Sequence, residues 1–256
     1  MLGRIIAQKR REVEELRVGL DIDKVSELKR SKHPRNFNHT PNRVAVIAEL
    51  KKASPIKGQL CADYNLPDMA LSYAENGAAV ISVLTDKEFF QGSPDFLPEI
   101  RTLVQLPLLR KDFIIDELQL YESLLLGADL VLLIAAVHNY PRLLDLTVKC
   151  RELGMEPLLE VHDREEVKKA LDLPVGMIGV NNRNLKDFTV DIKTSLKLAE
   201  YIPDNIGRVS ESGIRSAADM RLLGEHGYQA ALIGEALVTS PNPGMKLREL
   251  VNYDQG

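Results

Sequence analysis

Charged side chains and one amide recur along this chain, each at or near the end of a short apolar run. Glu49 and Lys51 follow VAVIA, and Lys111 ends PLLRK. The other members of the series are Glu160, Asn181 and Glu211. Carboxylates and ammonium groups that lie close together shift one another's pKa, so acid and base roles can separate between them. The series indicates acid–base chemistry, provided that the fold gathers these residues in one place.

The apolar runs themselves predict eight parallel strands, because they are continuously apolar and not alternating, as in strands covered on both faces. The predicted strands span 44–50, 79–84, 107–111, 130–135, 156–161, 177–181, 207–212 and 230–235. Helical patterns fill the intervals at 68–77, 95–104, 116–127, 140–154, 163–171, 192–202 and 216–227. Several of them end at a glycine suited to a left-handed cap, namely Gly77, Gly127, Gly154 and Gly227.

Repetition of a strand and a helix about every 25 residues predicts an α/β fold of the (β/α)8 TIM-barrel class, which needs about 250 residues. The chain has 256 residues. An open doubly wound sheet is the structural alternative, but it normally carries a glycine-rich turn after its first strand. The segment ELKKASPIKG is not such a turn. In a barrel the C-terminal strand ends share one opening, so the charged series would meet there.

The first part of the chain differs from the repeating units. Ile5, Ile6, Val13, Leu16 and Val18 recur at roughly helical spacing among charged residues, which predicts an amphipathic helix and no signal peptide. The segment SKHPRNFNHTPNR is then typical of a linker. We therefore expect an N-terminal helical extension and linker over 1–43 and a barrel over 44–256, within a single domain overall.

Composition excludes several classes of partner. The net charge is −4 with both signs mixed along the chain, so no basic surface for nucleic acid is expected. The most apolar segment, 124–137, is too short to cross a bilayer and contains Asp129, so no membrane partner is expected either. Cys61 and Cys150 form no CxxC pair or disulfide framework, which favours reduced thiols in a cytoplasmic protein.

The histidines show no metal-binding pattern. They are scattered, without an HExxH motif or a Cys/His cluster, and we expect surface or linker positions and no metal at His33, His39, His138, His162 and His226. His162 follows Glu160 by two residues and could line the rim of the barrel, but the sequence assigns it no role.

Two glycine-containing turns indicate a phosphate site. SESGI and LIGEAL lie at the ends of the seventh and eighth predicted strands and place Gly213 and Gly234 where the backbone leaves the sheet. Barrels frequently bind phosphate with these two loops and the N-terminus of a short extra helix. The alternative is that both glycines only make tight turns.

At these residues the sequence resembles the indole-3-glycerol-phosphate synthase family. The segments that carry the resemblance are IAELKKASPIKG, FFQGS, LLRKDFIIDELQLYES, LLEVHDREE, IGVNNRNLKDFTVD, VSESGI and ALIGEALV. The resemblance implies a cofactor-free lyase of tryptophan biosynthesis. Its phosphorylated small-molecule substrate would be 1-(2-carboxyphenylamino)-1-deoxyribulose 5-phosphate, and its products indole-3-glycerol phosphate, carbon dioxide and water.

The resemblance also implies roles for individual residues. Lys111 matches the family's general acid and Glu160 its general base, and the remaining catalytic positions match Glu49, Lys51, Asn181 and Glu211. The positions that would bind substrate carboxylate, phosphate and ring match Ser54, Arg183, Ser212, Gly213, Gly234, Glu235, Phe90, Phe113, Leu132 and Leu185. Ile56 departs from the family, which commonly has a small polar residue there, so details of the first loop are open.

Two other functions remain as alternatives. A phosphoribosylanthranilate isomerase-like barrel would be expected to end its first strand in a cysteine base, where this chain has Glu-Leu-Lys. A non-catalytic phosphate-binding barrel would be expected to have lost catalytic groups, and none is visibly lost. A monomer or weak homodimer is expected.

Overall fold

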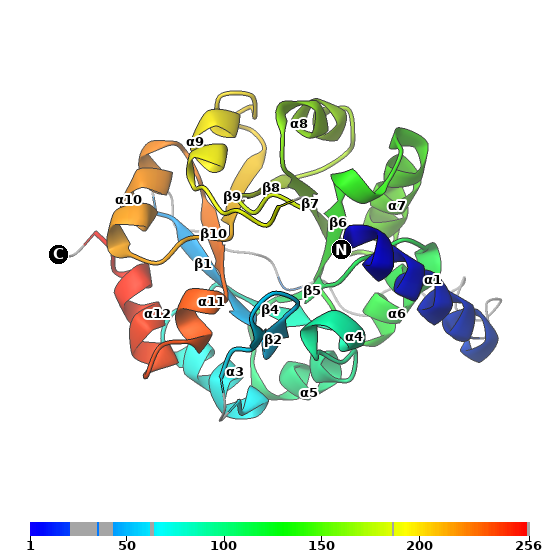
Figure 1. Cartoon of the computed structure of the whole chain (residues 1–256), viewed down its shortest axis with the longest axis horizontal. Helices are drawn as coiled ribbons and strands as arrows, with labels where there is room; N and C mark the ends of the chain where they lie inside the picture. Colours follow the sequence, from blue (N-terminus) through cyan, green and yellow to red (C-terminus); the bar gives the residue numbers. More distant parts are fainter. Residues whose placement is uncertain (21–34, 36–42, 62–63, 186, 255–256) are drawn as a thin grey trace.

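In the computed structural model, eight parallel strands close into a barrel surrounded by helices (Figure 1). The structure describes residues 1–20, 35, 43–61, 64–185 and 187–254. Around the barrel the strand order is β1-β10-β9-β8-β7-β6-β5-β4, and every neighbouring pair is parallel. The predicted TIM barrel is confirmed.

All eight predicted strands are present, with ends that differ by no more than two residues. The barrel strands are β1 (Ala45–Leu50), β4 (Val80–Leu84), β5 (Leu108–Lys111), β6 (Leu130–Ile134), β7 (Glu156–Val161), β8 (Met177–Asn181), β9 (Gly207–Glu211) and β10 (Ala230–Ile233). The loop after β1 contains a small antiparallel pair that the sequence did not predict, β2 (Ala53–Ser54) and β3 (Gly58–Gln59).

The described helices include one in each of the seven intervals predicted from the sequence, the predicted N-terminal helix, and a helix after the last strand for which no pattern was predicted. They are α1 (Leu2–Gly19), α3 (Leu66–Glu75), α5 (Phe96–Leu103), α6 (Glu117–Leu125), α7 (Tyr140–Glu152), α8 (Arg164–Leu171), α9 (Lys193–Ala199), α10 (Ala217–Glu225) and α12 (Pro243–Val251). Three short helices lie in loops at strand ends: α4 (Lys87–Phe90), the 3-10 turn η1 (Ala135–Val137) and α11 (Glu235–Val238).

Local sequence explains where these helices begin and end. Asp116 and Ser216 each form a capping box at the start of α6 and α10, which satisfies backbone N–H groups that have no partner inside the helix. The glycines predicted to follow helices adopt positive φ, between 73° and 95°, at Gly77, Gly127, Gly154 and Gly227. These caps set each helix directly behind the strand that it covers.

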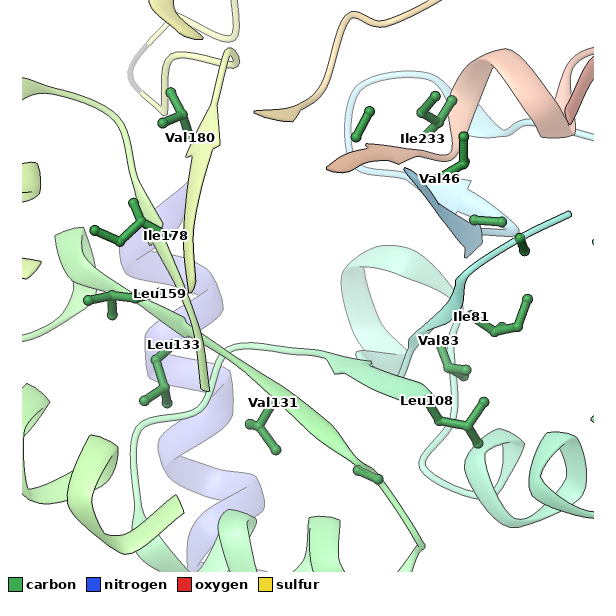
Figure 2. Packing of buried hydrophobic residues seen from close by; sticks show 14 of the residues in the cluster. Val46, Ile81, Val83, Leu108, Val131, Leu133, Leu159, Ile178, Val180 and Ile233 are labelled. Atoms are coloured by element: carbon green, nitrogen blue, oxygen red, sulfur yellow. The ribbon is translucent and has the colours of Figure 1, made fainter. Parts of the chain in front are cut away.

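The alternation of side chains along the strands produces two separate apolar regions. Outward-facing residues such as Val131, Leu133 and Ile178 point away from the barrel axis and pack beneath the helices (Figure 2). Inward-facing residues, among them Ile47 and Leu158, fill the barrel itself. Both sets are buried, so the fold forms a continuous support under the C-terminal strand ends.

The N-terminal helix lies against the barrel and reaches its opening. In Figure 1, α1 runs alongside α6 with its N-terminal end toward the barrel. Ile5, Lys9 and Val13 form its buried face. Val18, which the helical pattern grouped with the apolar face, is 91% exposed. That part of the prediction is wrong because the helix continues past the surface that it packs on, and a lysine occupies the middle of its buried stripe.

Lys9 is buried because it neutralises carboxylates from two barrel loops. Its ammonium nitrogen lies 2.9 Å from Asp86 Oδ2, 2.8 Å from Asp112 Oδ1 and 2.8 Å from Glu12 Oε2. Burial alone would lower the pKa of Lys9, but the Asp112 and Asp86 carboxylates outweigh it and raise that pKa. Burial would likewise raise the pKa of Asp112, yet Lys9 and Arg110 lower it to about 2. The cluster joins the extension to the loops after β4 and β5.

Residues 21–34 and 36–42 lie outside the described residues, so the predicted linker and the division of the chain at residue 43 stay predictions. None of the described helices is long and apolar enough to cross a membrane.

We predict that Lys9→Met destabilises the protein by about 3 kcal/mol or more, because two buried carboxylates lose their shared counter-ion. Chemical denaturation of the variant and of the wild type measures the effect. Arg10→Met, which alters the exposed neighbour on the same helix, is the control. Equal denaturation midpoints for all three proteins would show that the Lys9 cluster does not hold the extension in place.

Candidate active site

The mouth of the barrel is charged because polar residues occupy the last inward-facing positions of its strands. The strand register pairs Asn181 of β8 with Glu211 of β9, while Glu160 of β7 lies across from Gly179. Glu49 ends the inward-facing row of β1 and Lys111 that of β5. Because inward and outward positions alternate strictly, all five side chains that the sequence singled out on the strands enter one cavity.

Lys111 lies between two carboxylates at the centre of this cavity. Its Nζ is 3.5 Å from Glu160 Oε2 and 3.6 Å from Glu211 Oε2. Burial alone would lower the pKa of Lys111, but Glu160, Glu211 and Glu49 raise it. Burial would raise the pKa of Glu160, whereas Lys111 and His162 lower it. The pair therefore rests as an ammonium and a carboxylate, a charged proton donor beside a charged acceptor.

Glu211 behaves in the opposite way. Its side chain is buried, and neither carboxylate oxygen has a hydrogen-bond partner among the described residues. Burial and the neighbouring negative charge of Glu160 raise the pKa of Glu211 to about 8, although Lys111 opposes the shift. Three carboxylates around one ammonium cannot all ionise at little cost, so Glu211 holds its proton at neutral pH and can donate it in a hydrogen bond.

Glu49 and Lys51 form a second ion pair on the same rim. Lys51 Nζ lies 2.6 Å from Glu49 Oε2. Burial would raise the pKa of Glu49, but Lys51 and Lys111 lower it. The backbone of the last strand leaves room for this carboxylate, because a Cβ atom at Gly234 would clash with Glu49 Oε2. Gly234 therefore does more than form the turn predicted from the sequence, because its missing side chain also leaves room for Glu49.

An aromatic wall closes one side of the cavity. The rings of Phe90 and Phe113 face each other with centroids 6.3 Å apart. Phe90 ends helix α4, whose N-cap Asp86 accepts hydrogen bonds from the backbone N–H groups of Phe89 and Phe90. Because Asp86 is also bound by Lys9, the N-terminal helix supports this wall. Apolar rings in the lining suit contact with a substrate ring.

Another part of the cavity lining, after strands β9 and β10, combines a left-handed turn with positive charge. Ser212 and Gly213 both adopt positive φ, at 67° and 83°, directly after β9. Asn182 Nδ2 donates to the Ser212 carbonyl over 2.9 Å and so holds the strained turn. Gly234 precedes α11, whose first N–H groups have no partner within the helix. Such a turn beside a helix start can bind a phosphate group.

Two cations that the sequence did not single out flank this turn. Lys57 Nζ lies 2.7 Å from Glu235 Oε1, and Arg215 Nη2 lies 3.6 Å from the same oxygen. Lys57 follows Pro55 and Ile56 in the loop between β2 and β3, while Arg215 follows β9. Both residues lie in loops, where the sequence has no repeating pattern that would single them out. Only the folded structure brings them to the same oxygen of Glu235.

The cavity brings together all the residues predicted from the sequence. Its lining includes Glu49, Lys51, Ser54, Phe90, Lys111, Phe113, Leu132, Glu160, Asn181, Arg183, Leu185, Glu211, Ser212, Gly213, Gly234 and Glu235. Met1, Leu2 and Ile5 of the N-terminal helix line it too, although the sequence placed none of them there. In the sequence, only the apolar face of that helix indicated that these residues would be buried against the barrel.

The prediction of surface or linker histidines is wrong for two positions. His138 is half-buried, and its Nε2 lies 2.9 Å from the Ile114 carbonyl. Burial lowers the pKa of His138 to about 4. His162 is held between Glu160 and Glu166. Both rings fill gaps at strand ends that a linear pattern does not reveal. His33 and His39 lie outside the described residues.

Within the described part of the chain, no three histidine, cysteine, aspartate or glutamate side chains are grouped as metal ligands.

A closed parallel barrel with a charged cavity at the C-terminal strand ends defines the chain as a TIM-barrel protein with an enzyme-like site. The profile of the family described as "Indole-3-glycerol phosphate synthase" matches residues 2–250. The chain therefore belongs to the indole-3-glycerol phosphate synthase family. The activity of this family is that of a lyase acting by decarboxylation in tryptophan biosynthesis.

Curated relatives agree with the family match. An indole-3-glycerol phosphate synthase of Desulfotalea psychrophila is 48% identical over 254 residues, with 98% of each chain covered. One from Chlorobium luteolum is 46% identical, with 93% of each chain covered. One from Legionella pneumophila is 47% identical over 81% of this chain and 80% of its own. These matches set aside the isomerase and the non-catalytic barrel.

Similar solved structures support the fold alone. A 3-hexulose-6-phosphate synthase superposes with a TM-score of 0.66 at 13% identity, covering 82% of this chain and 99% of its own. KGPDC from Streptococcus mutans superposes with a TM-score of 0.64 at 13% identity, covering 83% and 98%.

We predict that Glu211→Gln stabilises the protein more at high pH than at low pH. The folded chain keeps the Glu211 proton up to about pH 8, whereas a glutamate with the ordinary pKa loses it near 4.5. The stability that Glu211 contributes to the wild type is therefore fully present below pH 4.5 and is lost as the pH rises toward about 8. Because a tenfold difference in proton affinity corresponds to about 1.4 kcal/mol, the advantage of the variant should grow by at least about 1 kcal/mol.

Denaturation at about pH 5 and about pH 8 measures this difference, since most of the range over which the stability changes lies between the two values. Glu225→Gln, at an exposed position, is the control. An advantage that stays constant with pH would mean that Glu211 is ionised in the folded protein.

Proposed function

We propose that this cavity converts 1-(2-carboxyphenylamino)-1-deoxyribulose 5-phosphate into indole-3-glycerol phosphate, carbon dioxide and water. The observation that carries the proposal is the Lys111 ammonium held between Glu160 and Glu211, in the cavity that the Phe90 and Phe113 rings also line. The aromatic ring of the substrate would lie against the phenylalanines, Leu132 and Leu185, with its carboxylate toward Ser54 and Arg183. The phosphate would occupy the turn at the other end.

Ring closure requires a proton donor at the ketone. The ring carbon that bears the carboxylate attacks the ketone carbon, and negative charge develops on the ketone oxygen. The Lys111 ammonium protonates that oxygen. Loss of carbon dioxide then restores the aromatic ring. Burial of Lys111 among carboxylates keeps it charged, so the donor is loaded before the substrate arrives.

Dehydration requires an acid and a base at once. The hydroxyl formed in ring closure leaves as water after it accepts a second proton, from Lys51 or Lys111. Glu160 removes the proton from the adjacent carbon, and the ring nitrogen supplies the electron pair. Glu49 holds Lys51 on the rim through their 2.6 Å ion pair. Asn181 orients Glu160, and Glu211 donates a hydrogen bond to the reacting oxygen.

The phosphate anchors the far end of the substrate. Backbone N–H groups around Ser212, Gly213, Gly234 and Glu235 would bind it, with Lys57 and Arg215 nearby to neutralise its charge. The binding energy of this remote group holds the ketone in reach of Lys111 and so lowers the entropic barrier to ring closure.

We further propose a cytoplasmic enzyme, active as a monomer or weak homodimer, that needs no cofactor and binds neither nucleic acid nor membranes. The purified chain, given the substrate without added metal or cofactor, should form a product with indole fluorescence. Absence of that product would refute the proposed reaction.

Lys111→Met should lower kcat by about 100-fold or more, because it removes a positioned proton donor. The fold should persist with a lower melting temperature, since Lys111 lies outside the apolar core but is the counter-ion of buried carboxylates. Steady-state fluorescence kinetics and a thermal melt measure both properties. Lys52→Met, one residue beyond Lys51 and outside the cavity lining, is the control. Near-normal turnover of Lys111→Met would remove Lys111 from the mechanism.

Glu160→Gln keeps the shape of the side chain but cannot accept a proton, so it should lower kcat about 100-fold with a much smaller change in KM. Glu156→Gln is the matched control, because Glu156 begins the same strand at the other end of the barrel. A change confined to KM would make Glu160 a binding residue.

A further inference from the structure

Gly179 is a buried glycine in the middle of strand β8. Glycine weakens the interior of a strand, and it often marks a place where another group approaches the backbone closely. The φ angle of Gly179 is not positive, so the backbone conformation does not require glycine there. Gly179 faces the barrel interior, because it lies two residues from Asn181, which enters the cavity. The reason for the glycine therefore lies in the space beside it.

The carboxyl group of Glu211 occupies that space. A Cβ atom at Gly179 would clash with Glu211 Oε1 and would lie 3.3 Å from the Glu211 carboxyl carbon. The next neighbour, Leu158 Cδ1, would be 3.4 Å away, which is ordinary contact. Glu211 lines the cavity, whereas Gly179 is not part of the lining. The missing side chain thus makes room for Glu211 and not for a substrate.

The strand register explains how Glu211 reaches this place. Its direct partner on β8 is Asn181, and Gly179 lies one inward-facing position deeper in the barrel. The Glu211 side chain therefore reaches back over β8, where it is buried. Burial is the largest cause of the raised pKa of Glu211, which is about 8. The space beside Gly179 is thus one source of the neutral carboxyl group in the site.

A second carboxylate of the site is accommodated in the same way. Gly234 follows strand β10, and a Cβ atom there would clash with Glu49 of the neighbouring strand β1. Gly179 stands in the same relation to Glu211 of its neighbouring strand β9. Two of the three carboxyl groups in the cavity therefore lie against a glycine of an adjacent strand.

We propose that Gly179 is a positioning residue, whose missing side chain sets the place of the Glu211 carboxyl group beside Lys111. Glu211 Oε2 lies 3.6 Å from Lys111 Nζ in this place. A methyl group at position 179 would displace the carboxyl group, because β7 and β9 hold the backbone of β8 on both sides while the Glu211 side chain can rotate. The inference rests on the proposed function, in which Glu211 donates a hydrogen bond to the reacting oxygen.

Gly179→Ala should lower kcat about tenfold and change KM by less than about twofold. Complete loss of a donor to a reacting oxygen costs about 100- to 1,000-fold in kcat, and a displaced donor should lose part of that. The residues proposed to bind the phosphate and the ring do not contact Gly179, so binding should persist. Steady-state kinetics of indole fluorescence measure both constants. Gly224→Ala is the control, because its methyl group would meet only Tyr253 Oη and Val44 Cγ2, both at 3.5 Å.

A double-variant cycle shows whether the loss passes through Glu211. In Glu211→Ala the carboxyl group is absent, so adding Gly179→Ala should change the rate by less than about twofold. Single turnovers with excess enzyme measure the slow variants. Thermal melts of the same four proteins give a readout that does not depend on activity. Gly179→Ala should lower the melting temperature of the wild type but not that of Glu211→Ala.

An unchanged kcat in Gly179→Ala would overturn the positioning role, as would the same tenfold loss in both backgrounds. Equal shifts of the melting temperature in both backgrounds would show that Glu211 does not occupy the space beside Gly179. A wild-type chain that forms no indole product would instead refute the proposed function, and the melting temperatures would still decide where the Glu211 carboxyl group lies.

Discussion

The site depends on one ammonium group shared among buried carboxylates. Without Lys111, the buried carboxyl groups of Glu160 and Glu211 would lack their shared counter-ion, and one of them would have to be neutral. With Lys111 present, Glu160 is ionised and Glu211 keeps its proton. The same electrostatic arrangement thus supplies a donor, an acceptor and a neutral acid within a few ångströms. Apolar strands below the cavity make these interactions strong by excluding water.

A second charged cluster, on the outer side of the same strand ends, holds this arrangement in place. Strand β5 sends Lys111 inward and Arg110 outward, and the next residue, Asp112, binds both Arg110 and Lys9. Through Asp86 the cluster also caps the helix that carries Phe90. The cluster therefore links the N-terminal helix both to the helix that carries Phe90 and to the strand end that carries Lys111. Loss of one partner would leave buried charge on the others.

The phosphate end follows a different principle, since it uses backbone conformation more than side-chain charge. The left-handed turn at Ser212 and Gly213 and the short helix after Gly234 bring backbone N–H groups to the lining of the cavity. Gly234 has a further task, because any Cβ there would displace the Glu49 carboxylate. Gly234 therefore serves both the turn proposed to bind the phosphate and the space that the Glu49 carboxylate occupies.

The sequence by itself determined the barrel and the strand-end residues, because a two-residue alternation in eight consecutive parallel strands leaves the last inward positions no other place to point. It also determined where several helices end, at glycines that adopt positive φ. Only the tertiary structure decided the burial of Lys9, the approach of Lys57 and Arg215, and the bridge that His162 makes between two carboxylates. These features join elements far apart in the chain or loops without a period, and a charged residue is buried only where the fold supplies its counter-ion.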